Sequence, residues 1–446
     1  MPILTSRSIA LLGALVLAGG SAARAVEPIA SDEFRVNTHT ANDQRIPSVA
    51  ADALDRGVVV WQSRNQDSPS WSVHGQRLSA DGALAGEEFR VNVVDGGRHE
   101  AQHVESTPAG DFVVAWTGER RGGSPLGIRA RGFNADGEAV SGDRLVSAPS
   151  DDLQILPRLS VRDAGDYRVV WEARDPDTSF DILSARFDAD GQALDDIVRV
   201  NQFGPTAQRR VDIAGDGRGR EVAVWQSAGV DGTGQRVFGR CLDDSGPVGD
   251  EFRIDPTNVG SQTRPRVAMA EDGRFSVIWE DNRGESSIDY RRVMLRLYAA
   301  DCTPLGDRRQ VNQFDESIQD LPDIARTGNG EWVAVWQSLS PDFEDQGIYA
   351  RRFDPAAQPL GDEFRVSQER EAFQDFPAVA GLADSGFLAA WESSGQDGSG
   401  FGIYARRFFG FSAAAEPLPV PGGTPIGYLG LMLLLWFFSL IALARR

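Results

Sequence analysis

One tryptophan recurs seven times along this chain of 446 residues, at intervals of 54 to 57 residues. Each copy ends an apolar run such as Val58-Val59-Val60 or Val333-Ala334-Val335. A strand that is apolar on both faces must be covered on both sides. The repeated tryptophans are Trp61, Trp116, Trp171, Trp225, Trp279, Trp336 and Trp391.

Each repeat contains the signals of four short strands. A Glu-Phe-Arg-Val-Asn-like segment (33–37 and 363–367, for example) is followed by a Gln-x-x-Pro segment, the tryptophan strand and an Arg-Phe strand such as 348–353. Four strands in about 55 residues cannot form a stable sheet alone. The pattern predicts an all-β fold, a seven-bladed β-propeller of four-stranded blades over residues 33–409. A linear β-solenoid is the structural alternative.

The two ends of the repeat region predict how the ring closes. The region begins with a Glu-Phe-Arg-Val-Asn segment at 33–37 and ends on the Arg-Phe strand at 403–408, with no further copy of that segment. The last blade therefore lacks its outer strand. We expect residues 33–37 to supply it.

The repeat pattern resembles a known group of proteins. Glu-Phe-Arg-Val-Asn, Gln-x-x-Pro, Val-Val-x-Trp-x-Ser and Gly-Ile-Tyr-Ala-Arg-Arg-Phe together are similar to the propeller-type repeat of large bacterial secreted and surface proteins, over residues 33–409. The resemblance implies a surface or extracellular location and a binding role. It brings no catalytic residues with it.

Both termini carry targeting signals. Residues 1–25 combine Arg7, an apolar run over 9–17 and Ala23-Arg24-Ala25, which is the pattern of a secretory signal peptide. Residues 426–444 contain no charge and are followed by Arg445-Arg446, which predicts a membrane-spanning helix over 426–446 with the C-terminus in the cytoplasm and the body outside.

A Pro/Gly spacer over residues 410–425 joins the repeats to this helix. Spacer, helix and terminal arginines resemble the sorting tails of Gram-negative envelope proteins, with Gly422-Gly423 matching the Gly-Gly type and Glu416-Pro417 close to the Pro-Glu-Pro type. Cleavage of such a tail, with release or relocation of the body, stays open.

The charge balance excludes one class of function. There are 45 basic and 65 acidic residues, a formal net charge of −20. A nucleic-acid phosphate array would be repelled by this surface. We expect a monomer at the cell envelope whose partners are the membrane, through its C-terminal helix, and a glycan or a protein.

One position of the repeat is polar in every blade. Seventeen residues before each repeated tryptophan stands a glutamine or histidine. The structural interpretation is that these side chains bond backbone between blades, and the functional one is a ligand-binding polar collar at the mouth of the central channel. We call them the collar residues: Gln44, His99, Gln154, Gln208, Gln262, Gln319 and Gln374.

The next position is charged in some blades only, which favours a specific role. Arg45, Glu100, Asp320 and Asp375 stand there. Asp320 and Asp375 fall in neighbouring blades 6 and 7, beside Arg45 of blade 1, so they predict either a cation or sugar site or a salt-bridge network.

A zinc-protease motif in the sequence is expected to be accidental. His99 to His103 match H-E-x-x-H, which binds zinc only on a helix. The repeat register places this segment on an inner strand, where residues four apart are separated by about 13 Å.

Two further features bear on cofactors and covalent structure. The loops after the tryptophan strands are rich in aspartate, which leaves Ca²⁺ as a candidate ligand and predicts no other cofactor. Cys241 and Cys302 are the only cysteines; export favours their pairing, whereas a four-residue offset between their repeat positions argues against it. The aspartates are Asp67, Asp175, Asp177, Asp231, Asp281, Asp342, Asp345 and Asp397.

These features predict a binding or interaction module at the cell envelope without catalysis. A glycan hydrolase with carboxylates at the channel mouth is the first alternative, which would require Asp320 and Asp375 to converge within about 5–9.5 Å. A purely structural envelope protein is the second.

Overall fold

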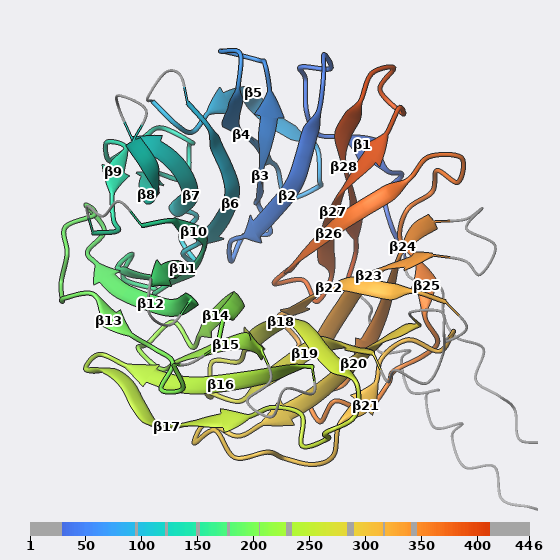
Figure 1. The fold of residues 1–446 in the computed structure, drawn as a ribbon. Coiled ribbons are helices and arrows are strands. Elements are labelled where there is room, and N and C mark those ends of the chain that lie inside the picture. Colours follow the sequence, from blue (N-terminus) through green and yellow to red (C-terminus); the bar gives the residue numbers. More distant parts are fainter. Residues whose placement is uncertain are drawn as a thin grey trace, which may run out of the picture.

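Seven antiparallel four-stranded sheets surround a central axis in the computed structural model (Figure 1). It describes residues 29–410, apart from short gaps at 94–96, 121–123, 149–151, 176–178, 205, 229–233, 283–289, 315–316 and 340–345. The predicted seven-bladed propeller is confirmed. The signal peptide, the spacer and the C-terminal helix predicted over 426–446 lie outside the described residues.

Six blades run from the axis outward in chain order, and blade 7 does so for its first three strands. The innermost strands are β2 (Gln44–Ala51), β6 (His99–Ser106), β10 (Gln154–Val161), β14 (Gln208–Gly215), β18 (Ser261–Met269), β22 (Gln319–Arg326) and β26 (Gln374–Gly381). The second strands, which carry the repeated tryptophans, are β3 (Gly57–Arg64), β7 (Phe112–Arg120), β11 (Tyr167–Asp175), β15 (Glu221–Ala228), β19 (Phe275–Asn282), β23 (Trp332–Leu339) and β27 (Phe387–Ser394).

The outer half of each blade is built in the same way. The third strands are β4 (Trp71–Leu78), β8 (Ser124–Phe133), β12 (Ser179–Phe187), β16 (Gln235–Asp243), β20 (Arg291–Tyr298), β24 (Gln346–Phe353) and β28 (Phe401–Phe408). The outermost strands are β5 (Leu84–Arg90), β9 (Arg144–Leu145), β13 (Val198–Arg199), β17 (Gly246–Arg253), β21 (Arg309–Gln310), β25 (Phe364–Arg365) and β1 (Phe34–Arg35). No helix long and apolar enough to cross a membrane occurs among the described residues.

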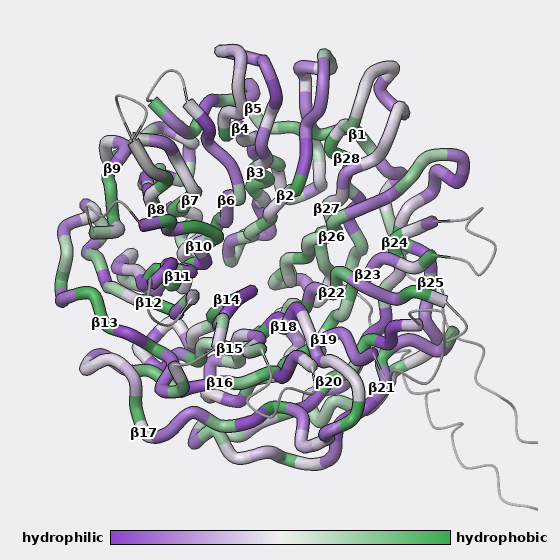
Figure 2. Tube along the Cα trace, in the orientation of Figure 1, coloured by the Kyte–Doolittle hydropathy of each residue, from purple (hydrophilic) through white to green (hydrophobic). Residues whose placement is uncertain are grey.

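The core lies between the blades. All seven repeated tryptophans are fully buried, and each packs on the preceding blade; Trp336 of blade 6, for example, lies in one cluster with Ile278 and Leu295 of blade 5. Valine and aromatic residues favour strands because they pack well on a pleated surface. Figure 2 shows hydrophobic stretches along the strands and mostly hydrophilic connections at the perimeter.

The Glu-Phe-Arg-Val-Asn segment ties neighbouring blades together. Its glutamate accepts a hydrogen bond from the backbone of the preceding blade, as Glu363 Oε2 does from Gln313 N at 2.6 Å. Its asparagine accepts one from the third strand of its own blade, as Asn312 Oδ1 does from Val293 N at 2.9 Å. The motif is therefore explained by the architecture.

The predicted ring closure is confirmed. β1 pairs with β28, with Phe34 opposite Ala405, and completes blade 7 as its outermost strand. Val36 N donates to Ile403 O at 2.8 Å, and the Val36 side chain is fully buried. The first and last blades are thus joined by hydrogen bonds between the two ends of the repeat region.

The argument against a disulfide is wrong. Cys241 and Cys302 are bonded, with their Cα atoms 6.6 Å apart. Cys241 lies near the end of β16 in blade 4, whereas Cys302 lies in the turn after β20 in blade 5. The four-residue offset is what the bridge needs, because this turn reaches back over the third strand of the preceding blade.

Candidate functional site

The candidate site is the mouth of the central channel, the end at which the innermost strands begin. The antiparallel register brings the start of each first strand, the end of each second strand and the start of each third strand to this end. Below it, two cavities of about 120 and 240 Å³ lie along the axis and are lined by the innermost strands.

The collar residues are buried within the blades. In four blades the repeated tryptophan donates its indole N–H to the collar side chain: Trp171 Nε1 to Gln154 Oε1 at 2.9 Å, for example, and Trp116 Nε1 to His99 Nδ1 at 3.1 Å. The same bond joins Trp225 to Gln208 and Trp336 to Gln319.

In the other three blades the collar amide bonds a residue opposite it in the second strand. Gln262 Nε2 donates to Asp281 Oδ1 at 3.2 Å and Gln374 Nε2 to Ser393 Oγ at 3.1 Å; Gln44 bonds Ser63 in the same way. These bonds lie within a blade. The structural interpretation had expected bonds to backbone between blades, and in five blades the collar amide also donates to a backbone carbonyl of the segment that leads into the blade, as Gln154 Nε2 does to Ala148 O at 2.9 Å. The ligand-binding role of the collar residues stays a prediction.

The H-E-x-x-H segment forms strand β6. His99 accepts from Trp116, whereas His103 Nδ1 accepts from Leu159 N of blade 3 at 3.1 Å. Ala101 between them has φ of 53°, and the strand register shifts there. The two histidines therefore serve different contacts, as the repeat register predicted.

A bulge with left-handed backbone recurs in every innermost strand, two residues after the collar residue. These seven residues have φ between 48° and 56°, which costs energy for side chains larger than glycine. In six blades the bulge N–H donates to the residue that follows the tryptophan of the preceding blade, as Ile46 N does to Glu392 Oε2 at 2.7 Å. The bulge residues are Ile46, Ala101, Leu156, Arg210, Arg264, Leu321 and Phe376.

Two blade interfaces use this arrangement to build the same cluster at the mouth. Between blades 7 and 1, Arg45 pairs with the buried Glu392 and stacks on Phe401 with its guanidinium carbon 4.2 Å from the ring centre. Between blades 3 and 4, Arg209 pairs with the buried Glu172 and stacks on Phe180 at 4.1 Å. We call these the 7/1 and 3/4 sites. Burial raises the pKa of both glutamates, against the effect of the arginines.

The interface between blades 5 and 6, the 5/6 site, reverses this arrangement. An acid, Asp320, stands where the other two sites have arginine, and Arg291 stands where they have an aromatic ring. Arg291 Nη1 lies 3.2 Å from Asp320 Oδ2 and 3.8 Å from the buried Glu280. Glu280 also accepts from Arg264 Nη1 at 3.1 Å.

The carboxyl group of Asp320 is in an unusual state. Burial raises its pKa to about 7, and the Glu280 carboxylate adds to the rise. Its Oδ1 atom is buried without a hydrogen-bond partner among the described residues. A carboxylic acid with this pKa is half protonated near neutral pH and can donate a proton.

Two further predicted residues, Asp375 and Glu100, also directly follow a collar residue and make fewer contacts at the mouth. Asp375 lies within electrostatic range of Asp320 and Arg45, and burial raises its pKa. Glu100 pairs with Arg98 at 2.7 Å. Arg45, Asp320 and Asp375 thus lie along one stretch of the mouth, where Arg45 pairs with Glu392 and Asp320 with Arg291. Their role as a ligand site or as a salt-bridge network stays a prediction.

Titratable side chains also line the channel below the mouth. His103, Arg158, Asp212, Arg266 and Asp323 occupy one level in five consecutive blades, with Arg158 Nε 3.5 Å from Asp212 Oδ1. Glu105 lies deeper; burial raises its pKa to about 8, and Asp212 and Asp323 add to the rise. The five residues of this level each stand four positions after the collar residue of their blade. An alignment of the repeats could therefore have identified them.

The predicted role of the aspartate-rich loops as Ca²⁺ ligands stays a prediction. No group of three or more His, Cys, Asp or Glu side chains in the described part of the chain could hold a metal ion. Asp67 Oδ2 bonds His74 Nε2 at 2.8 Å, and Asp281 pairs with Arg308 at 3.1 Å. Asp177, Asp231, Asp342 and Asp345 lie outside the described residues.

Sequence reasoning missed the partners that complete the mouth. Glu172, Glu280 and Glu392 each follow a repeated tryptophan directly, a signal that the alignment of repeats contains. Phe180 and Phe401 lie at or next to the start of third strands β12 and β28, and the first residues of the third strands vary too much for a sequence pattern.

The fold and the mouth define the chain as a seven-bladed β-propeller protein with a charged channel mouth. No protein-family model matches the sequence, and no curated protein matches it. Solved structures match by fold. A protein of unknown function from Dyadobacter fermentans aligns with a TM-score of 0.54 at 11% identity, over 86% of this chain and 99% of its own.

Two further similar structures are enzymes. The α-L-arabinanase of Penicillium chrysogenum, complexed with arabinobiose, aligns with a TM-score of 0.46 at 12% identity, over 85% of this chain and 98% of its own. The GH93 α-L-arabinofuranosidase of Fusarium graminearum, also with arabinobiose, has a TM-score of 0.48 at 12% identity over the same shares. At these identities the likeness concerns the fold alone.

Proposed function

We propose that this protein is an exported glycan-binding module of the cell envelope, with its binding site at the channel mouth. The signal peptide over 1–25 directs export, and the helix over 426–446 tethers the body outside the cytoplasm until any processing of the tail. The observation that carries the binding role is the pairing of an aromatic ring with a buried glutamate and an arginine at both the 7/1 and 3/4 sites.

The chemistry of these sites suits a sugar. An aromatic ring offers an apolar face to the C–H groups of a pyranose or furanose ring. Carboxylates accept hydrogen bonds from hydroxyl groups, and guanidinium groups donate to them in a fixed geometry. Six arginines and six acids leave the mouth without the strong single charge that a polyanion or polycation partner would need. Three ion pairs among them join neighbouring blades. The arginines and acids are Arg45, Arg98, Arg209, Arg210, Arg264, Arg291, Glu100, Glu172, Glu280, Asp320, Asp375 and Glu392.

A glycan array probed with the purified full chain tests the proposal. We expect binding to a subset of glycans, and a loss of at least about tenfold in affinity for Phe180→Ala and Phe401→Ala, because about 1.4 kcal/mol of contact corresponds to a factor of ten. Leu360→Ala removes an exposed apolar side chain from the opposite face and should bind as the wild type does. An empty array, or equal binding by all three variants, would overturn the proposal.

Glycan hydrolysis is the second candidate, favoured by the 5/6 site. Hydrolysis needs one carboxyl group that is protonated and a second that is ionised. Asp320, with its pKa near 7 beside Glu280, fits the first role. Reducing ends released from a retained glycan, and their loss in Asp320→Asn with binding intact, would identify a hydrolase; binding without release leaves a binding module.

A further inference from the structure

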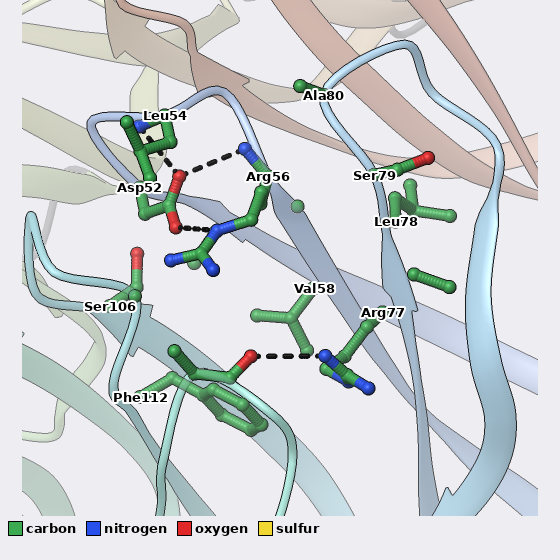
Figure 3. Close-up of a pocket in the computed structure, with 15 residues that line it drawn as sticks. Asp52, Leu54, Arg56, Val58, Arg77, Leu78, Ser79, Ala80, Ser106 and Phe112 are labelled. Atoms are coloured by element: carbon green, nitrogen blue, oxygen red, sulfur yellow. Dashed lines mark hydrogen bonds and ion pairs between the residues drawn. The ribbon is translucent and has the colours of Figure 1, made fainter.

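A further cavity lies far from the mouth, between blades 1 and 2. It measures about 320 Å³, at the low end of small-molecule pockets, which span about 300–1,000 Å³. The turns that join first to second and third to fourth strands surround it, so it opens at the opposite end of the ring. Its walls are mainly apolar, with Val58, Leu78 and Phe112 among them (Figure 3).

Two other blade interfaces carry a larger side chain at the position that borders this hollow. Val58 is the second residue of β3, and blades 3 and 7 have Arg168 and Leu388 at the equivalent position. In blade 7 Leu388 fills the corresponding interface and packs against Gly57. In blade 3 Arg168 fills it with a buried ion pair to Glu221 at 2.6 Å. Between blades 1 and 2 several further wall residues are small: Ala50, Ala80, Ala85, Gly110 and Ala135.

The pocket also carries a guanidinium group that lacks an acidic partner. At the equivalent position in other blades, Arg186 pairs with Asp244, Arg352 with Glu331 and Arg407 with Asp384. Arg77 donates to the carbonyl of Ala135 at 3.1 Å, and no carboxylate of the described residues lies within ion-pair distance of it. This is notable in a chain with a net charge of −20.

The second arginine of the pocket is already neutralised. Arg56 Nε donates to Asp52 Oδ2 at 2.6 Å, and its Nη2 donates to Ala109 O at 2.9 Å. Figure 3 shows this pair at one end of the pocket and Arg77 beside Val58 at the other. The open positive charge therefore lies next to the apolar wall, and the neutral pair lies apart from it.

We propose that this pocket binds a small organic carboxylate with an apolar body. The carboxylate takes the free N–H groups of Arg77, because a guanidinium group matches a carboxylate in two parallel hydrogen bonds. The hydrocarbon body packs against Val58, Leu78 and Phe112, which gains free energy by removing apolar surface from water. The inference is independent of the glycan site, since it concerns the opposite end of the ring.

Octanoate tests this proposal by isothermal titration calorimetry with the full chain, and octanol serves as the uncharged probe of the same length. We expect octanoate to bind at one site and octanol at least about tenfold more weakly, a difference of about 1.4 kcal/mol. Arg77→Gln should reduce the preference for octanoate over octanol. Absence of octanoate binding to the wild type overturns the proposal.

Matched variants separate occupation of the pocket from a change in folding. Val58→Leu introduces the residue that blade 7 carries at this position and should weaken octanoate binding, because the added methylene group takes space from the hydrocarbon body of the ligand. Val333→Leu makes the same change at the equivalent position of blade 6 and should leave binding unchanged. If Val58→Leu and Val333→Leu bind octanoate equally well, the octanoate does not occupy this pocket and the assignment is wrong.

Discussion

At the scale of the residue, every position has six counterparts around the ring, and a departure from them marks a specific role. The 5/6 site is the clearest departure at the mouth, because two positions change together: Asp320 replaces an arginine and Arg291 replaces an aromatic ring. A single change would leave two acids or two bases in contact. The coupled change preserves an ion pair while it brings the Asp320 and Glu280 carboxyl groups together.

The raised pKa of Asp320 predicts a pH-dependent stability. The folded protein holds the proton of Asp320 more tightly than the unfolded chain does. The contribution of this proton to the free energy of unfolding is therefore complete below the unfolded pKa near 4 and is lost as pH rises through about 7. Asp320→Asn removes this titration. We therefore compare the difference in free energy of unfolding, variant minus wild type, at two pH values. We expect this difference to be more positive at pH 8 than at pH 5, because only the wild type loses stability as the pH rises.

Chemical denaturation of both proteins at the two pH values measures this effect. Asp81→Asn provides the control, since Asp81 is exposed in a turn at the opposite end of the ring. An Asp320→Asn difference that is the same at pH 5 and pH 8 would contradict a proton held at this site.

At the scale of the element, the innermost strand makes two kinds of contact, one within its own blade and one with the preceding blade. It begins with a collar side chain that bonds within its own blade, and two residues later its bulge donates an N–H to the preceding blade. The bulge shifts the register by one residue, so the following side chains, such as Arg158 and Asp212, point toward the channel cavity. The bulge residue of each innermost strand thus lies between the residues at the mouth and the residues that line the channel.

The closing strand β1 makes a testable contribution to the ring. Deletion of residues 33–37 removes the pairing with β28 and exposes the surface that Val36 covers, which should lower the free energy of unfolding by at least about 2 kcal/mol from burial alone. Thermal melting followed by circular dichroism measures it. Ile29→Ser changes an exposed residue at the same end of the chain and should melt as the wild type does; an unchanged melting temperature in the deletion would show that closure is dispensable.

At the scale of the whole molecule, the ring is held by repeated contacts between neighbours and by one covalent bond. Cys302 has φ of 67° and stands at a turn position where blades 1, 2 and 3 have Gly82, Gly137 and Gly191. A left-handed backbone is unfavourable for a non-glycine residue. The disulfide to Cys241 links blades 4 and 5 across a sequence separation of 61 residues.

Removal of this bond should destabilise the ring. In the chain-entropy description, a cross-link closing about 60 residues stabilises the fold by about 4 kcal/mol. We expect the Cys241→Ser, Cys302→Ser double variant to unfold at a lower denaturant concentration than the wild type, and the reduced wild type to match it. Two titratable thiols in the native protein, with no effect of reductant on unfolding, would contradict the bridge.

Much of the architecture could be predicted because it depends on spacing along the chain. The period of the tryptophans, the apolar runs and the missing last strand determine seven blades, their strand order and the closure by residues 33–37. The collar position was also visible in the repeat. Its glutamines, however, bond tryptophans and strand residues within a blade, and sequence alone could not separate that role from a channel lining.

What only the tertiary structure decided concerns contacts between blades. The four-residue offset of Cys241 and Cys302, the mouth clusters around Glu172, Glu280 and Glu392, and the hollow beside Val58 all depend on how far one blade is shifted against the next. A repeat states which residues are equivalent, and equivalent residues of neighbouring blades meet where the blades converge on the channel, as Arg158 and Asp212 do. In these three features the side chains that meet stand at different positions of the repeat, and the packing geometry alone brings them together.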